Sequence, residues 1–196
     1  QIGGSVPNVG AVASNTATGD FYAVQNSGSN IYKITPDGTT TVFAQRNTAL
    51  GSTYGGALVI GNFLYVTYYT GGNTGGLARY DLTQTNPVGV TLVSNLDILS
   101  ITFRDGFIYG ACYTSGKIIK FNVANNTSTD LVSVPAYGPF GVGHNKAGDL
   151  FIAYYHAKQI WKYSPGTTTG GTLTNTGLSF TSNPSDVKID GQDNLY

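Results

Sequence analysis

The sequence contains no glutamate and no methionine, and charged residues make up only 10% of its 196 positions. Ten lysine and arginine residues balance ten acidic residues, all of which are aspartate. A weakly charged, neutral surface offers no electrostatic footprint for nucleic acid, so we expect no nucleic-acid partner. No apolar run approaches the ~18 residues that span a membrane as a helix, and we expect no membrane span.

The absence of methionine means that Gln1 is not an initiator residue, which indicates a processed chain or an internal fragment. The single cysteine, Cys112, excludes an intrachain disulfide and is expected to be a small buried side chain. Strong helix formers are scarce, whereas glycine, threonine, asparagine, valine and tyrosine are abundant. This composition predicts an all-β protein and resembles that of secreted, extracellular surface proteins.

A repeat of about 43 residues dominates the sequence. The run Gly19-Asp20-Phe21-Tyr22-Ala23-Val24 recurs four times in related form. The aligned aromatic residues are Tyr22, Tyr65, Tyr109, Phe151 and Tyr196. A short apolar motif with one basic residue follows each of the first four copies. Because side chains on a strand alternate between faces, we expect the basic side chain to be able to point to solvent. These basic residues are Lys33, Arg79, Lys120 and Lys162.

Each unit is expected to form four short strands, in the first unit at 9–13, 21–25, 30–35 and 40–44. Turn residues separate them, as in Pro36-Asp37-Gly38. Four antiparallel strands per unit of this length are typical of a β-propeller blade. We therefore predict a single β-propeller domain of about 4.5 blades, part of a six-bladed ring. The predicted blades cover residues 7–50, 51–95, 96–136, 137–181 and, in part, 182–196.

Tyr196 falls inside a predicted strand, whereas a propeller ring leaves no strand edge open. We therefore expect the chain to be incomplete at its C-terminus, with the ring completed by further sequence or by another chain.

The repeat units resemble those of NHL-repeat and SMP-30/gluconolactonase propellers. The shared pattern is Pro-x-Gly, then Gly-Asp/Asn-Leu-Tyr-Val, Ile-x-Lys and Pro-Asp-Gly, and its clearest copies here run over 7–43 and 139–166. The resemblance implies the propeller fold. It also implies, for the lactonases, a divalent cation held by glutamate, asparagine and aspartate side chains. This chain has no glutamate, so Asn8, Asp97 and Asp186 are the candidate ligands for a cation such as calcium.

Several tyrosines are expected at one rim of the blades, where second strands end and first strands begin. Tyrosine offers a flat apolar ring and a hydroxyl group, which suits binding of a glycan or a protein. The alternative is that these rings pack between neighbouring blades. The candidate ligand-binding residues are Tyr54, Tyr69, Tyr113, Tyr137, Tyr155 and His156. The other histidine, His144, is expected on the opposite face.

Two overlapping N-glycosylation sequons begin at Asn125 and Asn126, in a predicted exposed turn. No nucleophile elbow, phosphate loop or paired-histidine zinc motif is present, so we expect no catalytic residue and no cofactor.

The sequence as a whole favours an extracellular β-propeller that binds a glycan or a protein partner through a tyrosine-rich face. One alternative is a metal-dependent hydrolase or lyase of the SMP-30/gluconolactonase type. The other is a structural subunit of a surface coat or filament, which would associate with itself.

Overall fold

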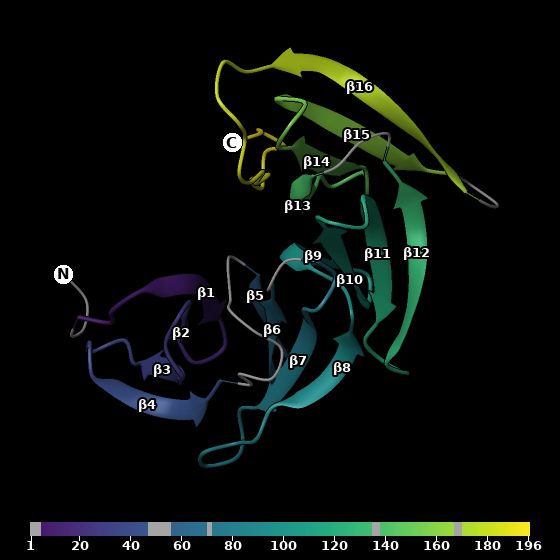
Figure 1. Ribbon diagram of the computed structural model, residues 1–196. Coiled ribbons are helices and arrows are strands. Elements are labelled where there is room, and N and C mark those ends of the chain that lie inside the picture. Colours follow the sequence, from purple (N-terminus) through teal and green to yellow (C-terminus); the bar gives the residue numbers. More distant parts are fainter. Residues whose placement is uncertain (1–4, 47–55, 70–71, 135–137, 167–169) are drawn as a thin grey trace. The chain divides into compact units, whose positions relative to one another are not determined.

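A computed structural model describes residues 5–46, 56–69, 72–134, 138–166 and 170–196, whose strands form four antiparallel sheets of four (Figure 1). In every sheet the strands are neighbours in chain order. Sheet 1 contains β1 (Val9–Asn15), β2 (Asp20–Gln25), β3 (Asn30–Ile34) and β4 (Thr40–Gln45). Sheet 2 contains β5 (Ala57–Ile60), β6 (Phe63–Tyr68), β7 (Gly76–Asp81) and β8 (Val90–Ser94). Sheet 3 contains β9 (Ile98–Arg104), β10 (Phe107–Cys112), β11 (Lys117–Asn122) and β12 (Thr127–Ser133). Sheet 4 contains β13 (Pro139–His144), β14 (Leu150–Tyr154), β15 (Gln159–Pro165) and β16 (Gly171–Ser179).

The strands fall within the predicted blade ranges, and the segment after β16 forms a bridge between Ile189 and Leu195. That the blades belong to one domain stays a prediction. The chain divides into two compact units, Gln1–Ile98 and Leu99–Tyr196. No helix among the described residues is long and apolar enough to cross a membrane.

The tightest hairpins owe their shape to residues that accept a positive φ. Between β9 and β10 only Asp105 and Gly106 form the turn, with φ of 50° and 82°. Two successive positive φ values give a turn whose twist matches that of the paired strands. The Asp-Gly pair therefore ends one strand and begins the next without a longer loop.

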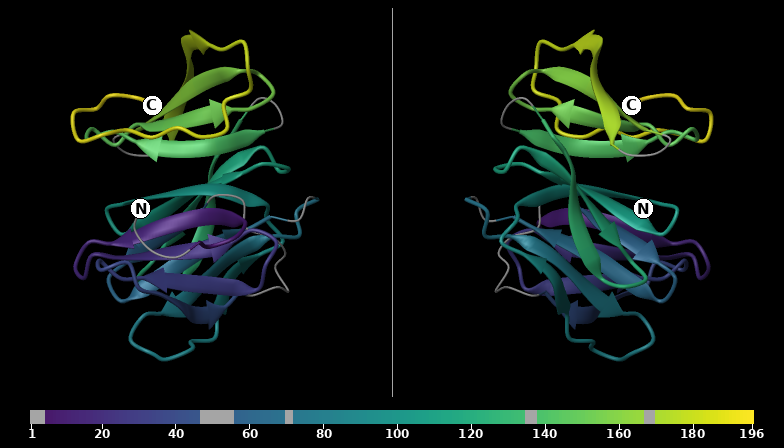
Figure 2. Two further views of the ribbon diagram at one scale, coloured as in Figure 1. Left: turned by 90° about the vertical axis from the view of Figure 1, so that its left-hand side faces the viewer. Right: turned by 90° about the vertical axis from the view of Figure 1, so that its right-hand side faces the viewer.

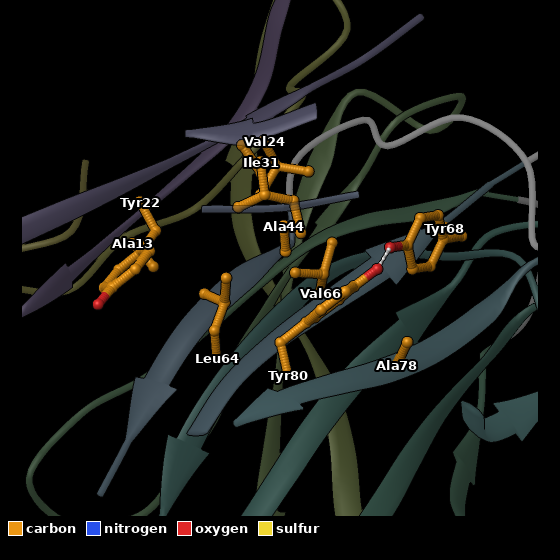
Figure 3. Close-up of a cluster of buried hydrophobic side chains, with 11 residues drawn as sticks. Ala13, Tyr22, Val24, Ile31, Ala44, Leu64, Val66, Tyr68, Ala78 and Tyr80 are labelled. Atoms are coloured by element: carbon orange, nitrogen blue, oxygen red, sulfur yellow. Dashed lines mark hydrogen bonds between the residues drawn. The ribbon is translucent and has the colours of Figure 1, made fainter. Parts of the chain in front are cut away.

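In the first unit, the core lies between facing sides of sheets 1 and 2 (Figure 3). Side chains on a strand alternate between faces, so Tyr22 and Val24 of β2 point to the same side. They meet Leu64 and Val66 of β6, and Val24, Leu64 and Val66 have no exposed surface. At one edge of this core the hydroxyl groups of Tyr68 and Tyr80 lie 2.6 Å apart and share a hydrogen bond.

The basic residue of each repeat contacts a residue that begins or directly precedes the second strand of its sheet. In sheets 1 and 4 that residue is an aspartate: Asp20 begins β2 and lies 2.8 Å from Lys33, and Asp149 directly precedes β14 and lies 3.6 Å from Lys162. In sheets 2 and 3 it is a phenylalanine, and a cation lies over its ring. The Arg79 guanidinium is 4.4 Å from the centroid of Phe63, and the Lys120 ammonium 3.9 Å from that of Phe107. Lys33 and Lys162 face solvent in part, with 34% and 37% of their side-chain surface exposed, and their long side chains also lie along the sheet and bind a neighbour.

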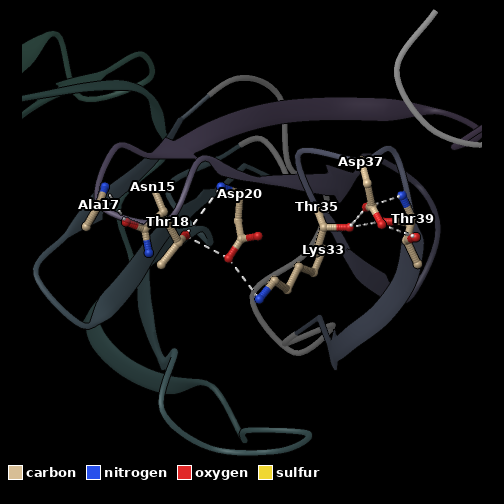
Figure 4. Close-up of polar contacts among 8 residues, drawn as sticks. All are labelled: Asn15, Ala17, Thr18, Asp20, Lys33, Thr35, Asp37 and Thr39. Carbon is tan, nitrogen blue, oxygen red and sulfur yellow. Dashed lines mark hydrogen bonds and ion pairs between the residues drawn. The ribbon is translucent and has the colours of Figure 1, made fainter.

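Figure 4 shows how the aspartates of sheet 1 fix its turns and its ion pair. Asp20 accepts hydrogen bonds from the Thr18 hydroxyl (2.7 Å) and binds Lys33. Asp37, in the Pro-Asp-Gly turn, accepts from the Thr35 hydroxyl and from the Thr39 amide at 3.1 Å. An aspartate that accepts from the residue two positions ahead stabilises a turn.

These ion pairs make the folded state sensitive to acid. Burial alone would raise the pKa of Asp20, but the Lys33 ammonium and the Thr18 hydroxyl outweigh burial, and the net pKa is lowered. The Ser164 hydroxyl, with Asn145 and Lys162, lowers the pKa of Asp149. A carboxyl group whose folded pKa is depressed stabilises the fold above its unfolded pKa of about 3.9, and that stability is lost as the pH falls through the folded pKa.

We therefore expect the melting temperature to fall steeply below about pH 4. The variant Asp20→Asn should lower the free energy of unfolding at pH 7 by about 0.5–1.5 kcal/mol and flatten the acid limb. Thermal melts followed by circular dichroism from pH 7 to pH 2.5 measure both effects. An acid limb of identical steepness in the variant would contradict this role for Asp20.

In the second unit, the chain beyond β16 turns back toward the rest of the unit (Figure 2), and residues 186 and 187 pass close to Gly141 and Gly143 of β13. Val187 is fully buried against Ala153 and Ile160. Gly141 of β13 makes this approach possible, because a Cβ atom there would lie 2.5 Å from Asp186 Cα. The glycine of the Pro-x-Gly motif is thus explained by the close passage of another backbone segment.

Candidate functional site

Four aromatic rings gather at one end of β13 and β14 in the second unit, and we refer to them as the ring cluster. Tyr113 follows β10, Tyr155 and His156 follow β14, and Phe140 lies near the start of β13. The register places them together, since Pro139 at the start of β13 pairs with Tyr154 at the end of β14. Antiparallel pairing therefore brings a strand beginning and a strand end to one edge.

The rings pack mainly face to face and edge to face. Phe140 and Tyr155 are stacked, with centroids 5.0 Å apart and planes at 26°. Tyr113 stands edge-on to both, at 5.9 Å from Phe140 and 6.4 Å from Tyr155. His156 is edge-on to Tyr155 at 5.1 Å. Stacked and edge-to-face contacts between aromatic rings are favourable, so the cluster is held in a defined shape.

A hydrogen bond and a glycine complete the cluster. The Tyr113 hydroxyl and His156 Nε2 are 2.7 Å apart, and either can donate, depending on the histidine tautomer. Gly138 has a φ of 105°, and its carbonyl accepts from the Tyr155 amide at 2.9 Å. A Cβ atom on Gly138 would lie 3.1 Å from His156 Cδ2. The glycine therefore allows the rings to approach the backbone closely.

The exposure of the rings decides what the cluster can contact. Tyr113, Phe140 and Tyr155 are half-buried, and His156 is exposed. Phe140 and Tyr155 cover one face of each other, and the exposed part of the cluster includes the Tyr113 phenol and the His156 imidazole. The cluster therefore combines ring surface with hydrogen-bonding groups in fixed positions.

Three of the predicted ligand-binding residues, Tyr113, Tyr155 and His156, lie together in the ring cluster. Tyr69 follows β6 in the first unit and is half-buried, while Tyr54 and Tyr137 lie outside the described residues. Phe140 was not predicted, because the candidate residues were chosen mainly at the ends of second strands and Phe140 lies near the beginning of a first strand. Its position inside a Pro-x-Gly motif was the available signal.

The predicted cation ligands have other partners in the structure. Asp97 is fully buried, and its carboxylate accepts from the amides of Asn73 at 2.9 Å and Gly75 at 3.3 Å. Asp186 binds the Lys188 ammonium at 2.9 Å. Asn8 is exposed, and its carbonyl accepts from the Asn26 amide at 2.6 Å. Among the described residues no three histidine, cysteine or acidic side chains cluster as metal ligands. The cation site stays a prediction.

The remaining predictions concern His144 and the sequons. His144 pairs with Leu150 at the end of β13 and β14 that lies away from His156. Asn125 and Asn126 are exposed in the turn between β11 and β12, where Asn125 Oδ1 accepts from the Thr127 amide at 3.1 Å. Their glycosylation stays a prediction.

A protein-family model described as a repeat of unknown function (DUF6923) matches residues 1–195. No curated protein resembles the chain closely enough to count as a relative. Among solved structures, the chain is similar to the extracellular domain of a putative hybrid two-component system from B. thetaiotaomicron (16% identity, TM-score 0.69). The match covers 96% of this chain but only 25% of that one.

Two further structures extend this likeness. A putative gluconolactonase matches with 9% identity and a TM-score of 0.73, over 94% of this chain and 70% of that one. Nidogen, from its complex with laminin, matches with 16% identity and a TM-score of 0.72, over 96% and 70%. These likenesses confirm the predicted fold: the four sheets are blades of a β-propeller of the type found in gluconolactonase and nidogen.

Proposed function

The chain belongs to the DUF6923 repeat family, and we propose that it is an extracellular β-propeller module that binds a protein partner through the ring cluster. The observation that carries the proposal is the packing of Tyr113, Phe140, Tyr155 and His156 into one half-exposed group. Tyrosine is enriched among the residues that dominate binding energy at protein interfaces.

The geometry of the rings favours a protein over a glycan at this cluster. A sugar stacks on an open ring face, and the contact at 5.0 Å between Phe140 and Tyr155 removes one face of each of these rings from such stacking. Ring edges together with a phenol and an imidazole suit an irregular protein surface, in which apolar contact surrounds a few hydrogen bonds. The small share of charged residues in the chain, 10%, also favours a protein partner, since charged residues are depleted at the centres of protein interfaces.

A structural relative supports an extracellular setting, since it is described as the extracellular domain of a putative hybrid two-component system. Nidogen in complex with laminin supports a protein partner. The expected secretion and the overlapping sequons at Asn125 and Asn126 are consistent with this setting.

The proposal is tested by placing a photo-crosslinking phenylalanine analogue at Tyr155 on the native cell surface. We expect one discrete crosslinked protein, absent when the analogue replaces the exposed Phe180 instead. With the captured partner purified, Tyr113→Ala and Tyr155→Ala should each weaken binding at least tenfold in biolayer interferometry, as expected of central interface tyrosines.

The fold of each variant is checked by circular dichroism before binding is measured. Identical crosslinks from both positions, or unchanged affinity in the two folded variants, would show that the ring cluster has only a packing role.

A further inference from the structure

The second unit contains a pocket of about 440 Å³ at the end of β13 and β14 away from the ring cluster. Three turns surround it: the β9–β10 turn, the β13–β14 turn, and the turn within the segment 188–196. A volume of this size lies within the range of ligand pockets, about 300–1,000 Å³. We call it the turn pocket.

Hydrogen bonds between the turns hold the wall of the turn pocket in place. Thr102 Oγ1 lies 2.8 Å from His144 Nδ1. The Arg104 guanidinium donates to the carbonyl of Asn145 at 2.5 Å. The Lys146 amide donates to the carboxylate of Asp193 at 2.9 Å and so joins the second turn to the third. The wall is therefore arranged before any ligand arrives, which lowers the entropic cost of binding.

The charged groups around the turn pocket balance. Arg104 is paired with Asp105 at 2.9 Å, and Lys188 with Asp186 at 2.9 Å. The charged side chains that line the pocket are Arg104, Lys146, Lys188, Asp105, Asp190 and Asp193. Three cations and three carboxylates line the pocket, so neither sign of charge predominates in its lining.

His144 supplies a hydrogen-bonding group in a fixed position, whereas the Asp190 carboxylate holds the third turn through four hydrogen bonds of its own. Asp190 Oδ1 accepts from the amides of Gln192 and Asn194 at 2.8 and 2.9 Å, and its other oxygen accepts from the Asn194 side chain and the Tyr196 hydroxyl. These bonds, the Asn194 side chain first, lower the pKa of Asp190 to about 2, so it remains a carboxylate. Burial, and then Arg104, lower the pKa of His144, so its ring is neutral at pH 7.

We propose that the turn pocket binds a neutral saccharide. A sugar hydroxyl can donate to a carboxylate and accept from a guanidinium or ammonium group, and the pocket lining contains both kinds of partner, with carboxylates at Asp105 and Asp193 and cations at Arg104 and Lys146. A neutral imidazole can meet a hydroxyl as donor or acceptor. Gly143 and Ile189 in the lining add apolar surface for the C–H face of a sugar. The balanced charge gives an ionic ligand no comparable advantage.

The test is titration of the isotope-labelled chain with maltose, cellobiose, lactose and diacetylchitobiose, followed by NMR. At least one disaccharide should give saturable shifts at the amides of Gly106, Gly148 and Gly191, which mark the three turns. Inorganic phosphate and glycine serve as anionic and zwitterionic comparators.

Two variants separate binding from folding. His144→Ala and Lys146→Gln should each raise the dissociation constant at least fivefold. Lys146 is exposed, so its substitution is expected to preserve the fold even where that of His144 does not. Lys158 is also exposed and lies near the other end of sheet 4, so Lys158→Gln is the matched control and should leave the affinity unchanged.

The proposal is overturned if no disaccharide shifts these amides, if phosphate or glycine binds more tightly than every sugar, or if a folded Lys146→Gln variant binds normally. Because these readouts concern the three turns and not the ring cluster, they are independent of the proposed protein partner.

Discussion

Leu64→Ala is expected to lower the free energy of unfolding of the first unit by about 2–5 kcal/mol, because it opens a cavity in a closely packed core. Leu64 has no exposed surface and lies between Tyr22 and Val24 on one side and Tyr80 on the other (Figure 3). Urea denaturation, followed by far-ultraviolet circular dichroism, measures the change.

Leu178→Ala is the matched control, since it removes the same atoms from a side chain that is 47% exposed. Its effect should stay within about 0.5 kcal/mol, the usual range for surface substitutions. Equal losses in the two variants would mean that the facing sides of sheets 1 and 2 do not form the core described here.

Gly141→Ala should release the segment 184–196 from β13. The added Cβ would lie 2.5 Å from Asp186 Cα and 2.7 Å from the Val187 nitrogen, and backbone atoms cannot move aside as a flexible side chain can. Forcing extra volume into such a contact costs about 1–3 kcal/mol. Hydrogen exchange at the Val187 amide, which is shielded in the native chain, should become faster by a factor of ten or more.

Gly191→Ala provides the comparison, because a Cβ atom at that position meets nothing within 4 Å. It lies in the same segment and should leave exchange at Val187 unchanged. Slow exchange at Val187 in Gly141→Ala would contradict the close passage of the two backbones.

The sequence predicted most of the fold because the repeat shows the strand pattern several times over. The predicted strands of the first unit, such as 9–13 and 21–25, differ from β1 and β2 by at most two residues at each end. Turn residues with positive φ, such as Gly19 at 75°, mark the boundaries in each copy. Local chemistry therefore determines where each strand begins and ends.

The sites were less predictable, and for a physical reason. Tyr113 and Tyr155 occupy equivalent positions directly after a second strand, and His156 follows Tyr155, so the repeat pointed to all three. Phe140 joins them only through the pairing of Pro139 with Tyr154, a contact that a sequence pattern does not reveal. The turn pocket was not predicted at all, because it is formed by turns whose sequences differ between copies. A comparison of repeats emphasises what the copies share and hides what distinguishes them.

The link between the basic residue and the start of the second strand bears on how such copies diverge. Lysine can bind a carboxylate, as at Asp20, or a ring face, as at Phe107, so either partner retains the attraction for the cation. An aspartate at the start of the second strand can therefore be replaced by an aromatic residue without a compensating change in the lysine. The sequences of the repeats can therefore diverge while each copy keeps the contact between its third strand and the start of its second strand. Common ancestry of the copies is then easier to recognise in the backbone than in the residues.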